Sequence, residues 1–171
     1  IRGSNPNGVR QWLESNGYQL PAAAGPAISY YVEHGWVFVA SKVRRASAGS
    51  KEAALHPLLF AFATRSAVYP TRLTAVNNGT CAIDLYVFGN RRATARHFDT
   101  VRCDRVYGDW PFNLGPGVWI TDREILSLIG GSKVGTKLSA RLSPQQMASD
   151  VDIHSGIFWC KGATVFSYSS A

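Results

Sequence analysis

The sequence predicts an α+β fold in which several short helices pack on a mainly antiparallel sheet. Runs of β-branched and aromatic residues alternate with short helical segments, and most of these helical segments carry their own capping residues. A length of 171 residues with 46% hydrophobic and 17% charged residues is typical of a globular domain. We therefore expect residues 1–171 to form a single α+β domain. Because the chain begins at Ile1, we also expect it to be a fragment of a longer protein.

Two short helices open the chain. The first begins after Asn7, whose side chain can cap it, and ends at Asn16 and Gly17, which enter the left-handed conformation easily. The second covers about Pro26 to His34 and stops at Gly35. The apolar sides of the two helices carry the side chains that we expect in the core: Val9, Trp12, Leu13, Ile28, Tyr31 and Val32.

Extended segments are expected next. Trp36–Val43 is rich in β-branched and aromatic residues and predicts a strand. Small and polar residues at Arg44–Ala54 predict a surface loop. Leu58–Thr64 then reads as a further extended run, with Phe60 and Phe62 on one face because of the two-residue period.

A hairpin is the strongest local prediction in the middle of the chain. Thr71–Val76 and Cys81–Phe88 both resemble strands, and the four residues between them, Asn77 to Thr80, form a tight-turn sequence. From Gly89 to Gly117 the pattern predicts little regular structure, and long irregular segments in compact domains often carry function.

Capping boxes dominate the last third of the chain. Thr121 and Glu124 predict a helix over residues 122–129, and Ser143 and Gln146 predict a second one that ends near Ser149. Leu142 and Met147 are placed to form a hydrophobic staple around the second box. Alternating residues between the two helices, 136–142, predict a half-buried strand, and residues 157–168 predict a final hairpin.

The charge pattern argues against several classes of partner. The net charge is +7, but the basic residues are scattered as singles and pairs, so we do not expect nucleic-acid binding. No apolar run is long enough to span a bilayer, so we expect no transmembrane segment. Neither a Rossmann nor a P-loop glycine motif occurs, so no nucleotide cofactor is implied.

Three cysteines leave two alternatives open. Cys81, Cys103 and Cys160 have no C-x-x-C spacing, so neither a zinc ribbon nor a thioredoxin-like site is indicated. In an exported protein one pair could be bridged and one thiol left over. In a cytosolic protein all three would be small buried apolar groups.

Several segments together resemble a known family. W-L-E-S-N-G-Y-Q-L-P (Trp12–Pro21), Y-P-T-R-L-T-A-V (Tyr69–Val76) and D-L-Y-V-F-G (Asp84–Gly89) carry the resemblance, and L-S-A-R-L-S-P-Q-Q-M (Leu138–Met147) continues it. They are similar to a bacterial exported family described as domain of unknown function 2330, over most of residues 9–147. The resemblance implies an extracellular or cell-envelope bacterial protein. This chain would be either the C-terminal part of a longer protein or an outlier of the family, and no catalytic residues can be carried over from the resemblance.

One hypothesis for function is catalytic. His97 and Asp99 lie on one side of an expected extended segment, with Cys103 and Asp104 shortly after, so a metal site is conceivable. Asp152 and His154 have the same spacing, which could orient an imidazole as a general base. This alternative is a hydrolase or metalloenzyme that uses His97, Asp99 and His154. The structural explanations of the same residues are a polar loop with local hydrogen bonds around His97 and a solvent-facing strand around His154.

The leading hypothesis is a non-catalytic binding or structural module of the bacterial envelope. Aromatic rings among glycines and prolines could stack on a sugar, although core packing under a long loop explains them as well. Arginines just upstream could complement an acidic ligand. The candidate ligand-binding residues, for a glycan or a protein partner, are Arg91, Arg92, Arg96, Trp110, Phe112 and Trp119. We expect no metal ligands and no cofactor.

Overall fold

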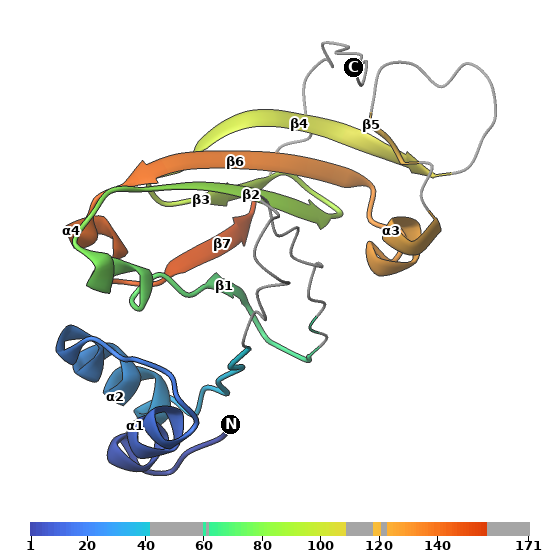
Figure 1. The fold of residues 1–171 in the computed structure, drawn as a ribbon. Coiled ribbons are helices and arrows are strands. Elements are labelled where there is room, and N and C mark those ends of the chain that lie inside the picture. The colour runs from blue at the N-terminus through green and yellow to red at the C-terminus, as the bar shows by residue number, and fades with distance from the viewer. Residues whose placement is uncertain (42–59, 61, 109–117, 121–122, 157–171) are drawn as a thin grey trace, which may run out of the picture. The chain divides into compact units, whose positions relative to one another are not determined.

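The computed structural model describes residues 1–41, 60, 62–108, 118–120 and 123–156. The chain divides into two compact units, Ile1–Arg65 and Ser66–Ala171 (Figure 1). Helices and mainly antiparallel strands are both present, so the predicted α+β class is confirmed. That residues 1–171 form a single domain stays a prediction.

The first unit is built on two helices, α1 (Pro6–Ser15) and α2 (Gly25–Glu33), with a 3₁₀ turn at Ala22–Ala24 between them. The Asn5 side chain caps α1 by accepting from the Asn7 N–H at 2.9 Å, and Pro6 occupies the first turn. The predicted cap at Asn7 was therefore wrong by two residues. Asn16 and Gly17 end α1 as predicted, with Gly17 at φ +74°.

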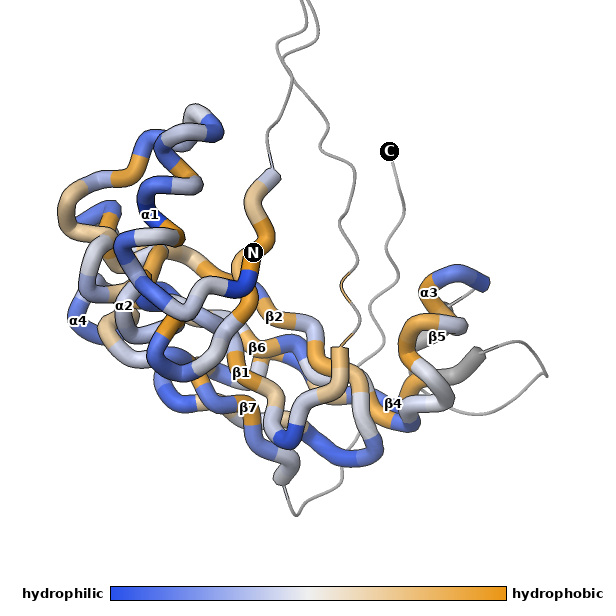
Figure 2. Tube along the Cα trace, turned by 90° about the horizontal axis from the view of Figure 1, so that it is seen from below, coloured by the Kyte–Doolittle hydropathy of each residue, from blue (hydrophilic) through white to orange (hydrophobic). Residues whose placement is uncertain are grey.

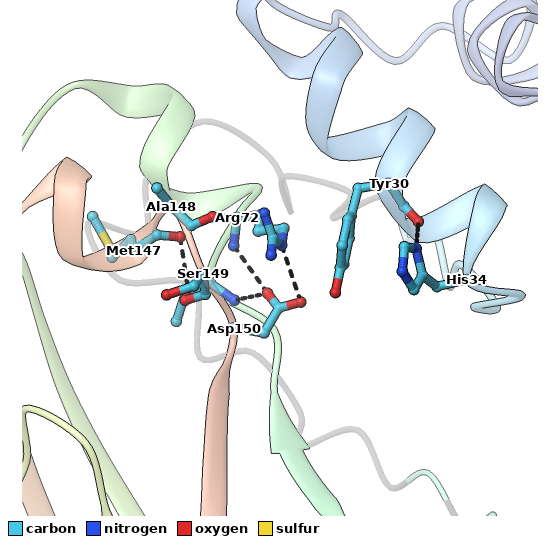
Figure 3. Close-up of polar contacts among 8 residues, drawn as sticks. Tyr30, His34, Arg72, Met147, Ala148, Ser149 and Asp150 are labelled. Atoms are coloured by element: carbon cyan, nitrogen blue, oxygen red, sulfur yellow. Dashed lines mark hydrogen bonds and ion pairs between the residues drawn. The ribbon is translucent and has the colours of Figure 1, made fainter.

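Five of the six predicted core residues of the helices are buried: Val9, Leu13, Ile28, Tyr31 and Val32. Trp12 is 43% exposed, so its assignment to the core was wrong. Val9 and Leu13 fill the buried side of α1. The Trp12 ring therefore lies at the edge of that side. At the end of α2, His34 Nδ1 lies 2.7 Å from the Tyr30 carbonyl oxygen (Figure 3).

The segment after α2 is extended but forms no strand over residues 36–41. Trp36 and Phe38 pack on Tyr31, with ring centroids 5.0 and 6.2 Å away, and Phe38 exchanges backbone hydrogen bonds with Ile1. The strand predicted at Trp36–Val43 is thus wrong for its described part, because its aromatic residues pack on a helix instead of joining a ladder. No strand forms over residues 62–64 either, and Phe60 and Phe62 are exposed. The predicted loop at 44–54 lies outside the described residues.

The second unit contains two sheets. One has the strand order β1-β7-β3, from Ala67–Tyr69, Val151–Ser155 and Ala93–Ala95. The other has the order β2-β6-β4-β5. There β6 (Val134–Leu142) lies between β2 (Cys81–Gly89) and β4 (Asp99–Gly108), antiparallel to both, and β5 (Val118–Ile120) joins β4 in parallel (Figure 1).

A hydrophobic core lies on one face of the four-stranded sheet. Strand β6 alternates buried and more exposed residues over Val134–Ser139. Figure 2 shows hydrophobic and hydrophilic residues mixed along the strands of this unit. The inward side chains of β2 and β6 meet residues from the three-stranded sheet and from α4 (Pro144–Met147). The buried members of this core are Ile83, Leu142, Met147 and Val151.

A polar network that we call the latch ties two distant segments of the unit together (Figure 3). Asp150 accepts from the backbone N–H of Thr71 at 3.0 Å and of Arg72 at 3.4 Å, and pairs with the Arg72 guanidinium at 3.4 Å. Thr71 is fully buried and its hydroxyl donates to the carbonyls of Met147 and Ser149. The latch therefore fixes the start of β7 against the segment after β1.

Two predictions in the middle of the chain were wrong. Thr74–Asn77 is a 3₁₀ helix, so the first arm of the predicted hairpin does not exist, and β2 pairs with β6 instead. The Thr71 hydrogen bonds to residues 147–150 turn the chain there and prevent a strand. The stretch 89–117, expected to be irregular, contains β3 and β4. Pairing with β6 overrides the poor β-propensity of the Asp residues in β4, and pairing with β7 forms β3.

The predicted helices and strand of the last third are confirmed. Helix α3 (Arg123–Leu128) ends at Gly130 and Gly131, both at positive φ, while its predicted capping residue Thr121 lies outside the described residues. Helix α4 has the full capping box of Ser143 and Gln146. The hairpin expected at 157–168 also lies outside the described residues. Within the described ranges, no helix has the length and hydropathy that a membrane span requires.

Candidate functional site

The four-stranded sheet carries a polar surface on the side opposite the core. In an antiparallel ladder, residues that pair across strands share a face. Tyr86 pairs with Lys137, Asp84 with Ser139, and Lys137 pairs in turn with Arg102. We call this surface the open face. Its polar and aromatic members come from β2, β6 and β4: Asp84, Tyr86, Phe88, Lys137, Ser139, Arg141, Asp99, Arg102 and Asp104.

A connected network lies at the centre of the open face. The Lys137 ammonium is 3.0 Å from an Asp84 carboxylate oxygen and 5.4 Å from the centre of the Tyr86 ring. The ammonium also hydrogen-bonds to the Tyr86 side chain, and the Ser139 side chain hydrogen-bonds to Asp84. Tyr86 nevertheless stays 65% exposed. The ring is therefore held from one side and open to solvent over most of its surface.

Hydrogen bonding controls the charge states in this network. The Ser139 hydrogen bond, and then the Lys137 hydrogen bond and charge, lower the pKa of Asp84 below its ordinary value. The hydrogen bonds to Asp84 and then to Tyr86 raise the pKa of Lys137. Both groups are thus held in their charged forms around neutral pH.

A glycine shapes the neighbouring part of the open face. The position of a Cβ on Gly135 would lie 3.2 Å from a Phe88 ring carbon and 3.2 Å from a Val106 methyl carbon. Phe88 and Val106 therefore cover the β6 backbone where that strand has no side chain. Tyr86 and Phe88 stand two residues apart in β2, so their rings rise from the same face about 7 Å apart along the strand.

A second ion pair lies on β4. Arg102 pairs through its Nε with Asp104, which is only 3% exposed. The two residues are separated by one position, so they project to the same side of the strand. Of the charged residues on the open face, Asp84, Lys137, Arg102 and Asp104 are thus paired locally.

The predicted ligand-binding residues that the structure describes lie on several different elements. Arg91 and Arg92 lie in the turn between β2 and β3, and Arg96 lies in the turn between β3 and β4. Arg92 has a buried Nε with no hydrogen-bond partner in the described part of the chain. Trp119 lies in β5 in register with Tyr107, while Trp110 and Phe112 lie outside the described residues. Their role in binding stays a prediction.

The predicted catalytic residues are distributed over different elements. His97 is exposed in the β3–β4 turn at φ +67°, Asp99 begins β4, and His154 is exposed in β7 opposite Thr94. Among the described residues, no group of three or more His, Cys, Asp or Glu side chains is placed to hold a metal ion.

The two cysteines that the structure describes differ in state. Cys103 forms a disulfide bond, and Cys81 is a free, half-buried thiol. A bridged Cys103 is not a thiolate, so it cannot be the soft metal ligand considered beside His97.

A small pocket lies among the described residues of the first unit. Pro6, Asn7 and Arg10 of α1 line it together with three residues of α2, and its volume is about 40 Å³. That volume holds a water molecule or two and excludes an organic ligand. The open face is therefore the stronger candidate.

Sequence reasoning missed the open face because it paired β2 with the wrong segment. The signal was present in two places: D-L-Y-V-F in β2 and T-K-L-S-A-R in β6 both alternate polar and apolar residues. Which residues meet across the strands depends on register, and register is set by the fold.

Comparison with known proteins identifies the family. No curated protein and no solved structure matches the chain. A family model, described as an uncharacterised protein conserved in bacteria, domain of unknown function 2330, matches residues 1–154. The match covers most of the chain, and not a C-terminal part alone. The chain therefore belongs to this bacterial family.

Proposed function

We propose that the protein is a non-catalytic binding module of the bacterial envelope or extracellular space, and that it binds through the open face. The observation that carries the proposal is Tyr86, a large ring that is 65% exposed yet contacted by Lys137, whose ammonium is itself paired with Asp84. Exposed aromatic residues with a polar surround are typical of binding surfaces. A ring that is already held loses less entropy on binding than a free one.

The charge states support binding over acid–base catalysis at this surface. A general acid or base works best when its pKa is close to the operating pH. The pKa of Asp84 is lowered and that of Lys137 is raised, so each moves away from neutrality. Both groups are therefore suited to hydrogen bonding with a ligand in a fixed charge state.

The disulfide supports the proposed location. Structural disulfides persist in oxidising compartments such as the periplasm and the extracellular space, and they are rare in the cytosol of mesophiles. Cys103 is bridged. This agrees with the exported character that the family resemblance implied, and location outside the cytoplasm is part of the proposal.

A sedimentation assay tests the proposal. The purified chain is mixed with washed bacterial envelope fragments, and the bound fraction is compared for the wild type, Tyr86→Ala and Phe62→Ala. Phe62 is the matched control, because it is an exposed aromatic residue outside the sheet. We expect the wild type and Phe62→Ala to sediment and Tyr86→Ala to remain in solution.

Two results would overturn the proposal: no sedimentation of the wild type, or equal sedimentation of Tyr86→Ala. The hydrolase or metalloenzyme alternative stays a prediction with its own test. If His97→Ala, Asp99→Ala and His154→Ala abolish a hydrolytic activity of the wild type, the protein is an enzyme and the non-catalytic assignment is wrong.

A further inference from the structure

We propose that the ligand of the open face is a neutral glycan, bound along β2 with a sugar ring stacked on Tyr86. This inference rests on the proposed function and names the class of ligand. It follows from three properties of the open face: an exposed aromatic ring, free hydrogen-bonding capacity beside the ring, and a balance of charge.

The exposed ring suits the apolar side of a sugar. The π face of an aromatic ring is electron-rich, and the C–H groups on one side of a pyranose are weakly positive. Because Tyr86 is 65% exposed, a sugar has access to it without displacing another side chain. Phe88, on the same side of β2 and partly exposed, gives a linear polymer a second apolar contact next to the first.

Hydrogen-bonding groups next to Tyr86 suit the hydroxyls of the same sugar. An ionised carboxylate has about four acceptor sites, and Asp84 uses sites for Ser139 and Lys137. The remaining sites accept from sugar hydroxyls. The Lys137 ammonium has three donors, of which Asp84 and Tyr86 occupy two. Hydrogen-bond donors of Lys137 and acceptors of Asp84 are thus both available next to the Tyr86 ring.

The balance of charge decides between a neutral and an anionic ligand. The open face carries three carboxylates and three basic groups, namely Asp84, Asp99, Asp104, Arg102, Lys137 and Arg141. The chain as a whole has a net charge of +7, so its excess positive charge lies elsewhere. The equal numbers of positive and negative groups give a polyanion no net electrostatic attraction to this face. A neutral polar polymer does not depend on such attraction.

Affinity electrophoresis tests the inference. The folded chain is run under native conditions in gels that contain dextran, galactomannan or hydroxyethyl cellulose as neutral probes, and in gels that contain heparin as the anionic probe. The variants are Tyr86→Ala, Tyr86→Phe and the control Phe62→Ala. Tyr86→Phe keeps the ring and removes only the hydroxyl, so it separates stacking from hydrogen bonding and guards against a folding defect.

We expect at least one neutral polysaccharide to retard the wild type, with retardation unchanged by added salt. Affinity should fall about tenfold in Tyr86→Ala and about threefold or less in Tyr86→Phe, since stacking on the ring supplies most of the binding energy. Phe62→Ala should behave as the wild type.

The outcomes separate this inference from the proposed function. If no neutral polysaccharide retards the chain, but envelope fragments still bind it through Tyr86, the glycan inference is wrong and the binding surface stands. Retardation by heparin alone, lost in salt, would identify an anionic ligand and also overturn the inference. If neither the fragments nor any polysaccharide binds, both proposals fail together.

Discussion

The latch and the open face use the same chemistry in different surroundings. In the latch, Asp150 is nearly buried and accepts from two backbone N–H groups and one guanidinium. On the open face, Asp84 accepts from a hydroxyl and an ammonium but is solvent-exposed. Both are carboxylates paired with a cation. Burial decides that the first holds two chain segments together, whereas the second keeps acceptor sites free for a ligand.

The effect of an ion pair on this protein therefore depends on its burial as well as on its two partners. Removing one partner of a buried pair leaves uncompensated charge and unpaired backbone groups, which is costly. Removing one partner of an exposed pair leaves a group that water solvates, so the fold changes little.

Asp150→Ala should have the largest effect on stability. It leaves the N–H groups of Thr71 and Arg72 without their acceptor, and we expect the free energy of unfolding to fall by about 2–4 kcal/mol. Urea unfolding measures the loss. Asp152→Ala is the matched control, because Asp152 is exposed two residues further along the same segment and should change stability by less than about 0.5 kcal/mol. Equal effects of the two variants would refute the structural role of the latch.

Ser143→Ala should destabilise the protein by about 1 kcal/mol. The Ser143 hydroxyl accepts from the Gln146 N–H at the start of α4, next to the buried Met147. Thermal unfolding measures the effect. Ser127→Ala serves as the control, since that exposed hydroxyl donates to the Glu124 carbonyl and caps no helix start. A Ser143→Ala protein as stable as the wild type would show that packing, and not the cap, holds α4.

Gly135→Ala should perturb the open face with a modest cost in stability. The new Cβ would lie 3.2 Å from Phe88 and Val106, so these side chains must shift by a few tenths of an ångström. Because Phe88 is at the surface and can move, we expect a loss below about 1 kcal/mol and a change in the NMR signals of its ring. Gly89→Ala is the control, because its nearest neighbour is 4.0 Å away. Unchanged Phe88 signals in Gly135→Ala would contradict this packing.

The smallest expected effects on stability come from the exposed network itself. Asp84 has a lowered pKa, so its contribution to stability is present above the unfolded pKa and is lost as the pH falls through the folded value, below about pH 4. Lys137→Met and Ser139→Ala should leave stability at neutral pH nearly unchanged, because Asp84 is exposed.

NMR titration of the Asp84 carboxyl measures its pKa directly and is a more sensitive test of that network than stability. The Ser139 hydrogen bond is the largest single cause of the lowered pKa, and Lys137 lowers it through both a hydrogen bond and its charge. Ser139→Ala and Lys137→Met should therefore each raise the Asp84 pKa, and the double variant should bring it closest to the ordinary value. If Lys137→Met alone restores the ordinary pKa, the hydroxyl does not lower it as we describe.

Local signals allowed much of the fold to be predicted. The capping box at Ser143, the glycine stops at Gly17 and Gly130, and the alternation over residues 136–142 each depend on residues close in the chain. Predictions failed where a distant partner decided the outcome. Residues 74–77 became a 3₁₀ helix because Thr71 bonds to residues 147–150, and 99–108 became a strand because β6 pairs with it.

The α+β class and the positions of most helices can be predicted from local signals, because caps, glycines and alternating patterns act over a few residues. The arrangement of Asp84, Tyr86 and Lys137 on one surface, and the structural role of Asp150, follow from tertiary contacts. The physical reason is that strand register and burial depend on contacts between segments about 50 to 80 residues apart, which no local pattern encodes.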